Sequence, residues 1–153
     1  MKKLFVIMIL FAAFATELSA QVLKPVTWNI TYKKVSEGVY DIICKATIDA
    51  TWHLYDTKLP EGGPLSTSFN FDEEESKGIE LVGEFKATTA PQKEHSEAFD
   101  MELRYFSNTV TFIQRVKLTA PTAKLVGYIE FMACTGGQCT PPAEEDFEFE
   151  LKK

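Results

Sequence analysis

Hydrophobic and polar residues alternate in short segments along most of the chain. The first two segments carry apolar residues at every second position, namely Val26, Trp28, Ile30 and Tyr32, then Tyr40, Ile42, Cys44, Ala46 and Ile48. A period of two residues is typical of a strand with one buried face. Because Ser36, Glu37 and Gly38 separate the two segments, the sequence predicts that they form a β-hairpin.

The same signal recurs later, without a competing helical period. It covers residues 52–55, 66–71, 79–85, 101–106, 109–118, 125–134 and 146–151. Eight or nine short strands in a chain of this length predict an all-β fold, an antiparallel immunoglobulin-like β-sandwich. Residues 86–98 show no strand pattern, and we expect them to form the longest loop.

The first twenty residues have the composition of a secretory signal peptide. Lys2 and Lys3 precede an apolar stretch, and Leu18, Ser19 and Ala20 follow it. A retained membrane anchor would need about 17 to 25 apolar residues, and Glu17 interrupts the stretch too early. We therefore expect residues 1–20 to be a cleaved signal and residues 21–153 to form one exported domain.

The charge of the chain restricts its partners. The net charge is −6 at pH 7, and the expected signal contains two lysines and one glutamate, so the remaining domain is more acidic by one charge. Such acidity argues against nucleic acid and anionic membrane surfaces as partners. The domain also has no later apolar stretch long enough to span a membrane, so we expect a soluble product without stable membrane insertion.

The most informative chemical feature is the pair Cys134 and Cys139. Gly136 and Gly137 between them allow a tight reversal, and outside the cytosol such a pair normally forms a disulfide. The ring is small, so the bond removes little entropy from the unfolded chain. Spacing alone favours a structural staple, while a weakly stabilising and exposed bond would also suit disulfide exchange.

Other site chemistries have little support in the sequence. Cys44 lies on an apolar strand face and is expected to be a buried, inert thiol. His53 and His95 do not stand at metal-ligand spacing relative to the cysteines, so no metal and no cofactor is expected. No pattern typical of a hydrolase or a nucleotide-binding site is present.

Three segments of the chain resemble one known family. They are Trp52-His53-Leu54-Tyr55, the run from Glu61 to Phe69 that begins Glu-Gly-Gly-Pro-Leu-Ser, and the run from Phe131 to Pro142 that contains both cysteines and ends Cys-Thr-Pro-Pro. Together they are similar to the N-terminal periplasmic domain of DsbD-type thiol:disulfide interchange proteins, especially the Bacteroidetes-like versions, also called disulfide bond corrector domains. The likeness extends over about residues 22–152.

This resemblance implies a periplasmic electron relay, that is, a thiol:disulfide oxidoreductase. We expect the domain to be a monomer. Cys134 and Cys139 would be the redox couple, Phe99 within a shielding loop would cover it, and His53 and Tyr55 would lie beside it. The implied partners are thioredoxin-like periplasmic proteins and a membrane thiol carrier. Because the chain ends right after the last predicted strand, we expect either a separate relay subunit or a domain whose redox supply has been lost.

One alternative stays open from the sequence. A non-catalytic β-sandwich that binds a protein or a glycan could use the same disulfide only as a hairpin clamp. The reduction potential separates the two hypotheses, because a structural disulfide resists reduction by glutathione.

Overall fold

The computed structural model describes residues 22–153, and the predicted signal peptide lies outside them. In this part of the chain every regular element is a β-strand. In chain order the strands are β1 (Val26–Ser36), β2 (Val39–Ile48), β3 (His53–Tyr55), β4 (Ser68–Phe71), β5 (Ile79–Ala87), β6 (Gln92–Ser96), β7 (Met101–Phe106), β8 (Thr109–Leu118), β9 (Thr122–Phe131), β10 (Ala133–Thr135), β11 (Gln138–Cys139) and β12 (Ala143–Lys152).

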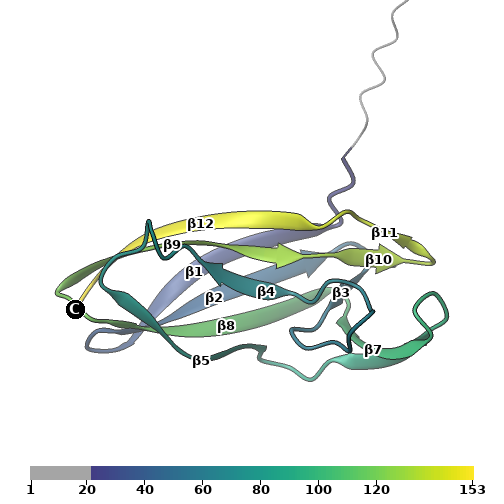
Figure 1. Ribbon diagram of the computed structural model, residues 1–153, viewed down its shortest axis with the longest axis horizontal. Coiled ribbons are helices and arrows are strands. Elements are labelled where there is room, and N and C mark those ends of the chain that lie inside the picture. The colour runs from purple at the N-terminus through teal and green to yellow at the C-terminus, as the bar shows by residue number, and fades with distance from the viewer. Residues whose placement is uncertain (1–21) are drawn as a thin grey trace, which may run out of the picture.

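The strands form three antiparallel sheets. One has the order β1-β2-β8-β5, a second the order β12-β9-β4, and a third the order β11-β10-β3-β7-β6. The first two lie face to face as the layers of a sandwich, and the β10–β11 hairpin and β7 lie at the end opposite to the C-terminus (Figure 1). The prediction of an antiparallel immunoglobulin-like β-sandwich is confirmed.

The core lies between the two layers and follows the predicted alternation. The alternate apolar residues of β2, which are Tyr40, Ile42, Cys44, Ala46 and Ile48, are buried. Phe112 of β8 packs against Trp28 of β1. From the other layer, Leu125, Ile129 and other alternate residues of β9 complete the core. Burial of this continuous apolar surface is the main favourable contribution to folding.

Two segments differ from the sequence prediction. Residues 86–98 were expected to be a loop, but β6 lies within them and pairs with β7. Residues 92–95 are all exposed, so this edge strand has no buried face to create an alternating signal. Residues 125–134 were expected to be one strand, but the chain passes from β9 to β10 at Met132 and changes its partners from β12 and β4 to β3 and β11.

Residues 22–153 contain no helix with the length and apolarity that crossing a membrane requires.

Candidate functional site

The cysteine pair lies in a β-hairpin at one end of the sandwich. Gly136 and Gly137 form its two-residue turn with φ of 43° and 93°, and glycine adopts such positive angles without the steric penalty of a side chain. The turn places Cys134 and Cys139 directly opposite each other, with Cα atoms 4.0 Å apart and a disulfide between the two sulfurs. The predicted reversal at the glycines is therefore present.

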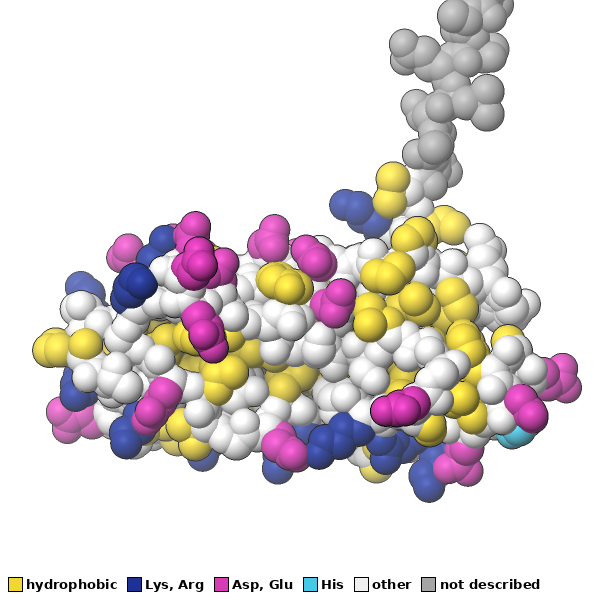
Figure 2. Space-filling model, viewed as in Figure 1, with side chains coloured by type: hydrophobic (Ala, Val, Ile, Leu, Met, Phe, Trp, Pro, Cys, Tyr) yellow, Lys and Arg dark blue, Asp and Glu magenta, His cyan; other side chains and the backbone are white. Residues whose placement is uncertain are grey.

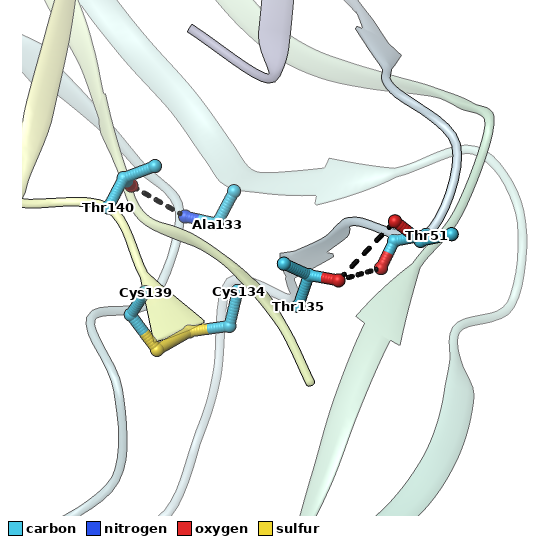
Figure 3. The surroundings of a disulfide bond; sticks show 6 residues. All are labelled: Thr51, Ala133, Cys134, Thr135, Cys139 and Thr140. Carbon is cyan, nitrogen blue, oxygen red and sulfur yellow. Dashed lines mark hydrogen bonds between the residues drawn. A yellow bond between two sulfur atoms is a disulfide. The ribbon is translucent and has the colours of Figure 1, made fainter. Parts of the chain in front are cut away.

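Besides the disulfide, one hydrogen bond fixes this hairpin to the segment before β3, and two others join its strands at the base (Figure 3). The Thr135 hydroxyl donates to the carbonyl oxygen of Thr51 over 2.6 Å. On the other side of the cysteines, the Thr140 N–H donates to the Ala133 carbonyl at 2.8 Å, and the Ala133 N–H donates to Oγ1 of Thr140 at 3.2 Å. The local backbone thus has polar contacts that do not depend on the sulfur bond.

The two ends of the disulfide differ in accessibility. Cys134 is only 8% exposed and packs in a small cluster with Tyr55 and Leu103, whereas Cys139 on the edge strand β11 is exposed. Disulfide exchange requires that an attacking thiolate approach a sulfur in line with the bond. This geometry makes Cys139 the more accessible end for a partner and leaves Cys134 covered.

The disulfide borders a cleft of about 660 Å³. The turn after β6 also lines the cleft, and the half-buried Phe99 of this turn packs against the cluster that contains Cys134. His53, Tyr55 and the two cysteines also line the cleft. The five residues singled out from the sequence are therefore brought together around one cavity.

Aromatic and acidic side chains also line the cleft. The rings of His53 and Tyr105 stack with centroids 4.0 Å apart, and Nδ1 of His53 lies 3.9 Å from Oε2 of Glu94. Burial, and then the charge of Glu94, raise the pKa of both Tyr55 and Tyr105 above its ordinary value. Acidic side chains lie next to a histidine at the end of the molecule that carries β7 (Figure 2).

Sequence reasoning missed three residues of this site, Glu94, Leu103 and Tyr105. Glu94 lies on β6, which was not recognised as a strand. The alternation of β7 does put Leu103 and Tyr105 on one face, but only the pairing of β7 with β3 and β6 brings that face to the cysteines.

The third cysteine lies apart from this site. Cys44 is a free thiol with no exposed surface, in the core between the two layers, and burial raises its pKa to about 12. Across residues 22–153, no group of three or more His, Cys, Asp and Glu side chains is arranged to hold a metal ion.

Comparison with known proteins places this geometry in a family. The family model described as "Thiol:disulfide interchange protein DsbD, N-terminal" matches residues 19–151. A search of curated proteins gave no match.

Two solved structures share the fold. The N-terminal periplasmic domain of ScsB from Proteus mirabilis superposes with a TM-score of 0.58 at 15% identity, covering 88% of this chain and 49% of that chain. The reduced N-terminal domain of DsbD from Neisseria meningitidis gives a TM-score of 0.50 at 13% identity, covering 81% of this chain and 86% of that one. This chain thus spans about half the length of the ScsB structure.

The family model extends over nearly the whole described domain, and the cysteine pair that carried the sequence resemblance is at disulfide distance, as thiol–disulfide exchange requires. The chain therefore belongs to the family of the N-terminal domain of the thiol:disulfide interchange protein DsbD.

Proposed function

We propose that this protein is a thiol–disulfide exchange protein whose redox couple is Cys134 and Cys139. It relays electrons from a membrane thiol carrier to oxidised periplasmic proteins. The observation that carries the proposal is the asymmetry of the disulfide, with Cys139 exposed at a cleft and Cys134 covered. A hairpin clamp does not need an accessible sulfur, whereas disulfide exchange does.

The reaction proceeds in two exchanges. In the reduced protein, the Cys139 thiolate attacks a disulfide of the oxidised substrate, forms a mixed disulfide and releases one substrate thiolate. Cys134 then attacks the Cys139 sulfur, which closes the Cys134–Cys139 bond and releases the second substrate thiolate. Two electrons pass to the substrate, and a donor dithiol restores the couple by the reverse exchange.

Three cleft residues have supporting roles in this proposal. Phe99 shields the couple, since its ring packs against the cluster around Cys134. His53 and Tyr55 form the wall of the cleft on β3, where His53 is the cross-strand neighbour of Cys134. A thioredoxin-like partner displaces the Phe99 turn and presents its own sulfur to Cys139.

The location and the extent of the domain belong to the same proposal. Residues 1–20 are removed as a signal peptide, and residues 21–153 act as a monomer in the periplasm. The order of charged, apolar and small residues in the first twenty positions supports export. The N-terminal domain of ScsB is a periplasmic domain, which is in keeping with that location.

The reduction potential of the pair tests the function. We expect a value of about −180 to −270 mV, the range of thioredoxin-like partners, measured by thiol trapping and mass spectrometry across dithiothreitol and glutathione buffers. A bond that stays closed below about −300 mV would instead identify a structural clamp. The domain would then be a binding module.

Single cysteine variants test the order of attack. With reduced thioredoxin as the donor and an oxidised thioredoxin-fold protein as the acceptor, both Cys134→Ser and Cys139→Ser should abolish electron transfer. Only Cys134→Ser should accumulate a covalent complex with the acceptor, because it retains the accessible sulfur and lacks the one that resolves the mixed disulfide. Equal trapping by the two variants would contradict the assignment of Cys139 as the attacking residue.

Removing the shield should make the reduced couple more sensitive to oxygen. We expect the reduced Phe99→Ala protein to oxidise in air severalfold faster than the parent, because the ring no longer covers the cluster around Cys134. Loss of free thiols with time measures this rate. Tyr32→Ala is the matched control, since Tyr32 is an exposed aromatic residue packed against Tyr40 and Phe149, outside the cleft. Equal rates for Phe99→Ala and the parent would remove the shielding role.

A further inference from the structure

His53 lies in the same cross-strand row as the two cysteines. In the pairing of β3 with β10, His53 is directly opposite Cys134, and in the pairing of β10 with β11, Cys134 is directly opposite Cys139. Side chains at opposed positions of antiparallel strands extend from the same face, with Cβ atoms about 4.5 to 5.5 Å apart. The three side chains thus form a row across one face of the sheet, with Cys134 in the middle.

The imidazole of His53 is positioned by its surroundings. Tyr105 of β7 stacks on the ring, and Oε2 of Glu94 from β6 lies 3.9 Å from Nδ1. The other titratable groups of the cleft are Tyr55 on the same strand, His95 on β6, Glu97 in the turn after β6, and the two cysteines. Within residues 22–153, Nε2 of His53 takes part in none of the hydrogen bonds or ion pairs. One ring nitrogen therefore faces an acid while the other is available.

The buried sulfur needs a base. The thiolate is the nucleophile in disulfide exchange, and burial in apolar surroundings disfavours it. Cys134 is 8% exposed, and the residues that line the cleft include no lysine and no arginine. The lining does include a second histidine, but neighbouring residues of a strand point to opposite faces, and His95 contacts Asp100 at 3.4 Å. His53 is the basic side chain next to Cys134.

We propose that His53 is the proton acceptor for Cys134 in the second exchange, and that Glu94 stabilises the resulting imidazolium. This inference rests on the proposed exchange function and assigns a catalytic residue to it. Once the mixed disulfide on Cys139 has formed, the Cys134 thiol gives its proton to His53. The Cys134 thiolate then attacks the Cys139 sulfur, and the departing substrate thiolate takes the proton from His53.

The test isolates Cys134 in a Cys139→Ser background, where the only other thiol is the buried Cys44. The rate of alkylation by iodoacetamide is measured against pH. We expect His53→Gln to slow alkylation at neutral pH about tenfold and to displace the pH profile upward by about one unit, since an adjacent cation shifts a thiol by about that amount. His53→Phe should do the same, because it keeps an aromatic ring next to Tyr105 but cannot take a proton.

His95→Gln is the matched control, because it removes the other histidine of the chain and should leave the profile unchanged. If alkylation in both His53 variants follows the parental pH profile, the ring only packs against Tyr105, and the inference is overturned. An equal displacement by His95→Gln would also overturn it, since the effect would then be a general change in charge.

A second measurement uses the protein with both cysteines. When the reduced protein reacts with a small aromatic disulfide such as 5,5′-dithiobis(2-nitrobenzoate), the mixed disulfide on Cys139 should accumulate in His53→Gln and not in the parent, as acid quenching and mass spectrometry will show. Absence of accumulation would contradict a role for His53 in the resolving step. The reduction potential of the parental disulfide is measured separately. The proposed relay function can therefore be contradicted by that potential while His53 still affects the reactivity of Cys134. Conversely, the relay function can be supported while His53 has no such effect.

Discussion

Replacing Gly127 with alanine is expected to lower the free energy of unfolding by about 3 kcal/mol, the upper part of the range for overpacked interiors. Gly127 of β9 lies between Phe71 of β4 and Phe147 of β12. A Cβ atom at this position would overlap the backbone oxygen of Asn70 and lie 2.8 Å from Cζ of Phe147. The backbone of Asn70 belongs to a paired strand and cannot move aside without breaking the β4–β9 ladder.

Urea denaturation of the oxidised protein measures this effect. Gly83→Ala is the control, because Gly83 has a φ of 71° but an added Cβ meets nothing within 4 Å. That variant should lose only about 1 kcal/mol, from the left-handed backbone alone. If the two variants lose the same amount of stability, the close approach of β4 to β9 is not what requires glycine at position 127.

Alkaline pH is expected to destabilise the fold through Cys44. Burial raises the pKa of this thiol from 9.0 to about 12, so above pH 9 the unfolded chain releases a proton that the folded protein still holds. The free energy of unfolding therefore has its full value below pH 9 and falls as the pH rises toward 12. The slope is about 1.4 kcal/mol per pH unit, which amounts to about 4 kcal/mol over the whole window.

Urea titrations at several pH values from about 8 to 11 test this prediction. Tyr55 and Tyr105 also have raised pKa values and contribute a slope of the same sign, so the comparison must be made with Cys44→Ala. That variant should lose the part of the slope that comes from the thiol, whatever its stability at neutral pH. Parallel slopes for the parent and Cys44→Ala would mean that the thiol titrates alike in the folded and unfolded chains.

The strands with one buried face could be predicted well from the sequence. The expected segments 101–106 and 109–118 coincide with β7 and β8, because in each of them apolar residues alternate with polar ones and the alternation reports burial directly. Strand β6 could not be found in this way. Its side chains are polar and exposed along an edge, so nothing in its composition distinguishes it from a loop.

In the cysteine hairpin too, one property could be predicted from the sequence and another could not. Its reversal followed from Gly136 and Gly137, a local property of two residues. That Cys134 is covered while Cys139 is accessible did not follow, because burial depends on which strands lie beside the hairpin. The change of partners at Met132 makes this difference, since it directs β10 toward β3 and away from the sheet of β9.

By itself, the sequence determined the all-β class, most of the strands, the tight turn between the cysteines and the likeness to the DsbD family. These properties depend on residues near one another in the chain, or on motifs that can be read in order. Only the tertiary structure decided that Glu94 and Tyr105 meet His53 and Cys134 around one cleft. Such contacts join strands that are far apart in sequence. The register in which these strands pair depends on the packing of the whole sandwich and not on local preferences of single residues.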